Sequence, residues 1–146
     1  MSKSSAYSVD LFELELNAAT IGNLADNASA SPATTLTISL HTADPTGGDQ
    51  STSEVAYTSY ARVTIVRTAA GWTVSATAGG ASAVNAAAIT FPASTGGANV
   101  VATHFSVGTG VGNYMLRSGA LSPPLTIVSG NPAPSFAAGE LTLTET

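Results

Sequence analysis

Alternation between apolar and polar residues is the feature that most limits how this chain can fold. In TLTISLHT, residues 35–42, the apolar side chains fall on one side of an extended chain, and the hydroxyl side chains and His41 fall on the other. This period of two predicts a half-buried strand with His41 directed away from the main apolar face. Similar short runs, separated by clusters of Gly, Pro, Asn and Ser, occupy residues 61–67, 72–76, 87–91, 100–107, 114–121, 124–128 and 140–145. About eight strands without intervening helices predict an all-β fold, a jelly-roll-like β-sandwich or barrel.

The N-terminal segment differs from the rest of the chain. Residues 8–21, SVDLFELELNAATI, predict a short helix, because Asp10 and Glu13 have the spacing of a capping box and Gly22 follows where the helix would end. The letters FELEL also alternate with period two, so a strand is the alternative.

A run of small polar residues follows this segment. Residues 23–33 predict a linker that separates an N-terminal helix and extended arm, residues 1–34, from a β-sandwich domain, residues 35–146. A short isolated helix is marginal in water, so its apolar side chains need a cover. We therefore expect residues 1–22 to dock on a neighbouring subunit or a larger partner through five apolar residues: Leu11, Phe12, Leu14, Leu16 and Ile21.

Composition limits the partners of the chain. Charged residues make up 9% of the sequence, against about 25% in an ordinary soluble domain. Leu, Ile, Val and Phe make up about a fifth of the residues, which predicts a lean core and favours an obligate oligomer. Four basic residues and a net charge of −5 argue against direct nucleic-acid binding, which needs a clustered basic surface.

The sequence also argues against several other classes. It has no cysteine, so neither a disulfide framework nor a thiolate metal site is expected. The first residues lack the apolar run of a secretory signal, and no segment approaches the roughly 20 apolar residues that span a bilayer. We expect synthesis in the cytoplasm and no membrane partner.

One stretch, LHTADPTGGDQSTSEVAY, residues 40–57, concentrates potential ligands for a metal ion. The spacing of its candidates matches no known metal loop, and the Asp-Pro and Gly-Gly pairs are typical of a turn. Asp44 is expected to bond its own turn backbone, and Asp49 and Glu54 are expected to stay solvated. A metal-dependent enzyme that uses His41, Asp44 and His104 is the alternative. We favour a connecting loop and predict no catalytic residue, no metal, no cofactor and no enzymatic activity.

The second histidine and the glycine-rich run also have simple interpretations. His104 lies on a predicted strand and is expected to be a structural hydrogen-bonding partner. Residues 106–113, SVGTGVGN, lack the lysine of a phosphate-binding loop and predict a hairpin turn.

Four aromatic residues, Tyr57, Tyr60, Trp72 and Tyr114, allow two interpretations. They could form a platform that stacks sugars, or they could anchor the core and an interface. No acid-rich run accompanies them, so we favour the second interpretation and take Tyr57 and Tyr60 as interface residues.

Seven motifs together resemble small virion proteins of tailed bacteriophages over residues 36–146. They are SLHTADP (39–45), SEVAYTSYARV (53–63), GWTVS (71–75), ITFPAST (89–95), THFSVGT (103–109), SGAL (118–121) and FAAGELTLT (136–144). Relatives of this kind are often labelled tail fibre proteins, and others are capsid cement or decoration proteins bound outside the major capsid protein.

The resemblance implies a virion structural protein with a short N-terminal helix. We favour the cement function, because fibres are usually long and repetitive and this sequence shows no internal repeat. The implied partners are the major capsid protein and further copies of the chain, in a homotrimer on the capsid exterior. The alternative is a tail-associated fibre or adhesin that binds host surface glycans.

Overall fold

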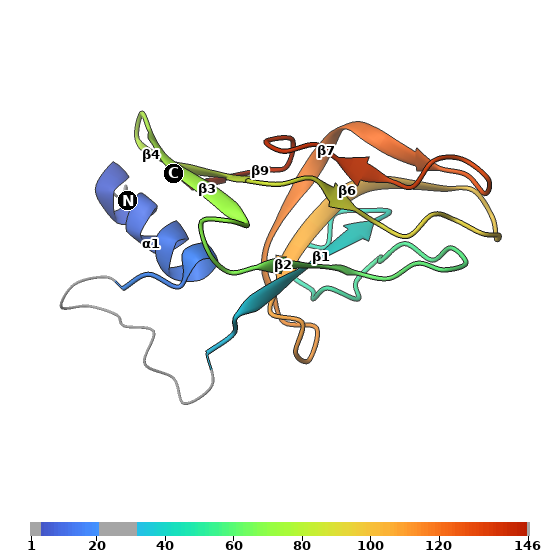
Figure 1. Ribbon diagram of the computed structural model, residues 1–146, viewed down its shortest axis with the longest axis horizontal. Coiled ribbons are helices and arrows are strands. Elements are labelled where there is room, and N and C mark those ends of the chain that lie inside the picture. The colour runs from blue at the N-terminus through green and yellow to red at the C-terminus, as the bar shows by residue number, and fades with distance from the viewer. Residues whose placement is uncertain (1–3, 21–31, 146) are drawn as a thin grey trace. The chain divides into compact units, whose positions relative to one another are not determined.

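The computed structural model of the chain describes residues 4–20 and 32–145, which contain one helix and nine strands (Figure 1). The all-β fold with a short N-terminal helix is confirmed. In chain order the elements are α1 (Ser5–Asn17), β1 (Thr35–His41), β2 (Val63–Val66), β3 (Trp72–Thr77), β4 (Gly80–Asn85), β5 (Ile89–Thr90), β6 (Val100–Gly108), β7 (Met115–Ile127), β8 (Ser135–Phe136) and β9 (Thr142–Glu145).

The described residues form two compact units. The helix unit contains α1 together with residues 66–88 and 137–145, and the four-stranded unit contains residues 36–65 and 89–136. The predicted division into residues 1–34 and 35–146 stays a prediction.

The four-stranded unit is built on a sheet of order β2-β1-β6-β7, with β5 and β8 paired separately. Strands β1 and β6 are antiparallel, with Ile38 opposite Val107 and His41 opposite His104. Residues on both faces of β1 are buried from Ile38 to His41. The predicted half-buried strand is therefore wrong on one point: the polar face of β1 is buried as well.

Strand β7 joins two segments that the sequence predicts as separate strands. Its pairing with β6 shifts from Ala120 opposite His104 to Leu125 opposite Ala102. Pro123 and Pro124 lie within this shift and have no N–H to donate to a ladder. The irregularity accounts for the apparent break in the sequence pattern.

The helix unit contains a three-stranded sheet of order β3-β4-β9. Helix α1 packs against β3 and β4, as Figure 1 shows beside the green hairpin, and Phe12 and Leu16 are fully buried. Asn85, at the end of β4, donates from its side chain to the carbonyls of Ala87 and Ala137, both at 2.8 Å. These bonds fix the C-terminal segment to β4.

Helix α1 begins and ends about three residues earlier than predicted. Ser4 is the N-cap, and its hydroxyl accepts a hydrogen bond from the Tyr7 amide at 3.2 Å. The helix ends at Ala18, which adopts a left-handed conformation with φ of 56°. A hydroxyl N-cap satisfies an orphan amide of the first turn, so the predicted capping box at Asp10 is wrong. The strand alternative for this segment is wrong too.

Candidate functional site

A cluster of buried polar side chains lies between β1, β6 and the loop after β1. Ser39, His41, Gln50 and Ser106 are all fully buried. Buried polar groups are costly unless they are hydrogen bonded, so the partners of each group decide what the cluster does.

Every member of this cluster has a hydrogen-bond partner. His41 Nδ1 lies 2.8 Å from the Thr52 carbonyl, which can only accept, so Nδ1 carries the proton. Its Nε2 then has one lone pair with which to accept, and Ser106 Oγ at 2.9 Å lies nearer to it than Ser39 Oγ at 3.1 Å. The Gln50 amide donates to Ser39 Oγ at 3.2 Å.

The environment keeps His41 neutral. Burial lowers the pKa of His41, and the hydrogen bond to the Thr52 carbonyl opposes this shift only in part. A serine hydroxyl beside a neutral imidazole has the chemistry of a nucleophile and its base. No solvent reaches His41, Ser39 or Ser106 in this structure, so the cluster joins β1 to β6 and offers no open reaction site.

The two acids of the loop after β1 stabilise turns. Asp44 Oδ1 accepts from Thr46 N at 2.9 Å and Thr46 Oγ1 at 2.7 Å, which confirms its predicted function. Asp49 Oδ1 accepts in the same way from the amide and hydroxyl of Ser51, at 2.8 and 2.6 Å, and is not merely solvated. These bonds lower the pKa of both carboxyls.

Glu54 forms an ion pair, so the prediction that it stays solvated is wrong. Its Oε2 lies 2.7 Å from Arg62 Nη2, and its Oε1 accepts from Arg62 Nε at 2.8 Å and from the Tyr60 hydroxyl at 2.9 Å. The Tyr60 oxygen also accepts from the Leu40 amide at 3.1 Å. Burial raises the pKa of Tyr60, which therefore acts as a neutral bridge between β1 and the ion pair.

The residues that the metal-dependent alternative would use as ligands do not converge. Across residues 4–20 and 32–145, no group of three or more His, Asp or Glu side chains is placed to hold a metal ion. His104 Nδ1 lies 2.9 Å from the Thr103 hydroxyl, in line with its predicted hydrogen-bonding role.

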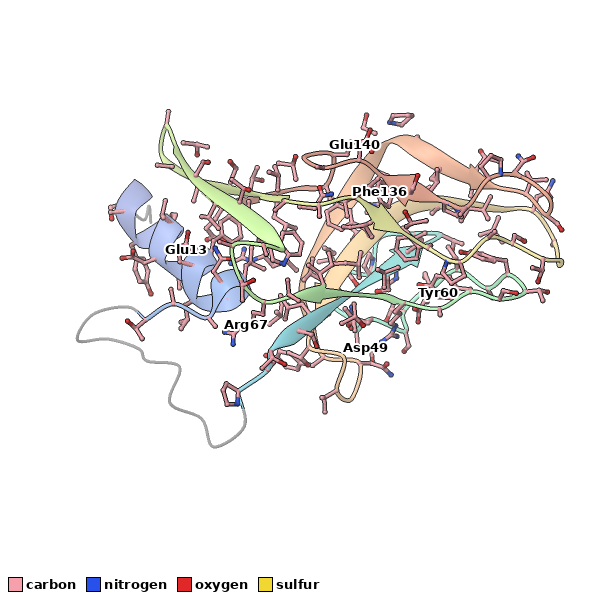
Figure 2. All side chains as sticks on the ribbon, viewed as in Figure 1. Glu13, Asp49, Tyr60, Arg67, Phe136 and Glu140 are labelled. Carbon is pink, nitrogen blue, oxygen red and sulfur yellow. The ribbon has the colours of Figure 1, made fainter. Side chains whose placement is uncertain are left out.

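Tyr57 lies in the core and Tyr60 is half-buried beside it, while the place of both residues at an interface stays a prediction. The Tyr57 side chain is buried, and its hydroxyl donates to the Pro92 carbonyl at 2.8 Å. The Tyr60 ring, labelled in Figure 2, packs edge-on against Tyr57 and stacks on Phe91. Trp72 is fully buried, so the platform for stacking sugars, which was the alternative for these aromatic residues, does not form.

The N-terminal residues that were predicted to form an interface differ in burial. Phe12 and Leu16 are fully buried within the chain, so these two have no free surface in this arrangement. Leu11 and Leu14 are half-buried, and Ile21 lies outside the described residues. Docking of the segment on another subunit or protein stays a prediction.

The most exposed apolar side chains lie at the tip of the β6–β7 hairpin, residues 109–114, which we call the hairpin tip. Val111 is 77% exposed and Tyr114 is 64% exposed. The tip is fixed by hydrogen bonds from Thr109 N to the Tyr114 carbonyl and from Gln50 N to the Asn113 carbonyl, at 3.1 and 3.0 Å. It carries no charge. A fixed, uncharged apolar projection is suited to bind a protein surface.

Sequence reasoning predicted this turn but missed its exposed side chains. Their exposure could have been predicted from the sequence, because Val111 and Tyr114 lie among glycines in a turn, and a turn cannot bury large side chains. Gly110 and Gly112 adopt positive φ, of 74° and 59°, which favours glycine at both positions.

Comparison with protein families assigns the chain to a family. The model of the family described as Podophage GP4 fiber I protein gp80 matches residues 15–144. The chain belongs to this family. Membership in the gp80 family identifies a bacteriophage structural protein of the virion and indicates a non-enzymatic function. The comparison with curated proteins gives no match.

No helix in the described part of this gp80-family chain is long and apolar enough to cross a bilayer.

Proposed function

We propose that this protein is a capsid cement protein that binds the outer surface of the shell formed by the major capsid protein. The hairpin tip carries the proposal, because Val111 and Tyr114 are exposed on a loop whose backbone is held in place. A loop that is ordered before binding loses little conformational entropy when it docks. Tyr is also among the residues that contribute most to protein interfaces.

The organisation of the strands supports cement over a fibre shaft. The described strands form short antiparallel sheets, and the sequence has no repeat of the kind that builds a long shaft. A protein built in this way can bridge neighbouring capsid subunits and oppose the outward pressure of a packaged genome.

Self-association fits the same function. A homotrimer matches the three-fold positions of an icosahedral lattice, and linked subunits bind their second and third sites at high effective concentration. Modest contacts at each hairpin tip then add up to strong attachment.

A binding assay tests the proposal. Purified protein is added to capsids that lack it, and bound copies are measured after sedimentation. We expect saturable binding that falls at least tenfold for the double variant V111S/Y114S, with an unchanged melting temperature. The matched control is Thr73→Ser, a hydroxyl-preserving change at an exposed position of β3. Equal binding by the double variant and the native chain would contradict a role for the tip.

The alternative is a tail-associated fibre or adhesin that binds host surface glycans. The word fiber in the family description and the exposed ring of Tyr114, which could stack on a sugar, favour it. Screening the protein on a glycan array separates the two functions. Specific glycan binding that Tyr114→Ala abolishes would support the adhesin.

A further inference from the structure

We propose that the surface of β3 and β4 that holds α1 also binds α1 of a second copy of this chain, so that neighbouring subunits exchange N-terminal helices. The proposal rests on how α1 is attached and does not depend on where the virion carries the protein.

Arg67 holds both ends of the connection between α1 and β1. Its side chain donates to the carbonyls of Leu14 and Glu15 in the last turns of the helix, from Nε to Glu15 at 2.6 Å. It also donates from Nη1 to the Ala33 carbonyl at 3.2 Å, and its backbone N–H donates to the Thr34 carbonyl at 2.9 Å. Figure 2 shows Arg67 beside the end of α1. The connection therefore starts and finishes next to one residue.

The connection is much longer than this path requires. Residues 18–32 join two points that a single arginine side chain bridges. An extended chain of about fifteen residues spans up to about 50 Å, and connections of this length are uncommon inside compact domains. Its length is sufficient to carry α1 to an adjacent subunit.

Exchange would preserve the contacts that hold α1. Phe12 and Leu16 would be buried on the same surface of β3 and β4, and Arg67 binds main-chain carbonyls of the helix, which every copy offers. In the closed form α1 binds its own chain, and in the exchanged form it binds a neighbouring chain. The two forms then differ mainly in the effective concentration of the helix at each surface, and a crowded lattice of subunits raises the concentration of neighbouring helices.

A change in the length of the connection tests this directly. Deletion of residues 22–29 leaves about seven residues, which still span up to about 24 Å and can close the path within one chain but cannot reach far beyond it. We expect the native chain to associate in light scattering and the shortened chain to be monomeric, with the same circular dichroism and melting temperature. The control replaces residues 22–29 with eight Gly and Ser residues and should associate like the native chain.

Two outcomes overturn the proposal. One is a native chain that stays monomeric up to millimolar concentration, and the other is a shortened chain that associates as strongly as the native chain.

Complementation gives a second, independent readout. Phe12→Asp removes a usable helix, and Ala83→Arg blocks the buried face of β4. Neither variant should associate alone, whereas their mixture should form a 1:1 species in native mass spectrometry, because the intact helix of one binds the intact surface of the other. Two folded variants that form no mixed species overturn the proposal. If Ala83→Arg does not fold, the deletion of residues 22–29 remains the test of the proposal.

Discussion

His41 Nε2 accepts a hydrogen bond from Ser106 Oγ at 2.9 Å, across the antiparallel pair of β1 and β6. Replacing His41 with Ala leaves the Thr52 carbonyl and two serine hydroxyls without this partner in a buried site. Loss of a buried hydrogen-bonding group and its volume should lower the free energy of unfolding by about 2–4 kcal/mol. Urea denaturation measures this, with exposed Thr64→Ala as a control expected to change stability by less than about 0.5 kcal/mol.

The same histidine makes stability depend on pH. Because burial lowers the pKa of His41, the folded chain binds a proton at this site less readily than the unfolded chain does. The contribution of His41 to the free energy of unfolding is therefore complete when the pH is above 6.5, the ordinary pKa of histidine. It decreases as the pH falls below that value. Denaturation between pH 8 and pH 5 should show a smaller decrease for His41→Gln than for the native chain. An equal decrease in both would contradict this assignment.

The ion pair between Glu54 and Arg62 should stabilise the four-stranded unit. Both side chains are partly exposed, at 18% and 21%, so solvent screens the pair and we expect a coupling of only about 1 kcal/mol. A double-mutant cycle with Glu54→Gln and Arg62→Met measures it, and Tyr60→Phe should cost about 1 kcal/mol by loss of its hydrogen bonds. A coupling energy of zero would contradict a stabilising function of this ion pair.

Phe12 should contribute strongly to the stability of the helix unit. Phe12→Ala removes a fully buried ring, which typically costs about 3–5 kcal/mol. Trp72 is the single tryptophan of the chain and is fully buried in this unit, so its fluorescence should shift to the red at lower urea concentration in the variant. The matched control is Tyr7→Ala, whose side chain on the same helix is 37% exposed, and its transition should stay near that of the native chain.

Much of the fold could be predicted from local patterns. Alternation correctly placed β1, β3, β6 and β9, because large apolar or β-branched residues mark one face of each strand. Strand β4, GASAVN, was missed, because alanine and glycine have weak strand preference and its position follows from pairing with β3 and β9. Such pairing is not encoded in the strand itself.

The burial of His41 could not be predicted in the same way. A row of Thr, Ser and His residues indicates a solvent-facing side, unless a second polar set covers it. Gln50 supplies part of that set from the loop after β1, and Ser106 supplies the rest from the paired strand β6. The partners of Glu54 and the exposure of Tyr114 also depend on the tertiary structure.

The location of the protein on the virion tests the central claim most directly. Cryo-electron microscopy of purified virions, compared with virions assembled without this protein, would reveal the density that it contributes. The cement function predicts density on the outer surface of the capsid shell, at repeated positions of the lattice and lost in the mutant virions. Density confined to the tail, with an unchanged capsid surface, would contradict it and favour the fibre function.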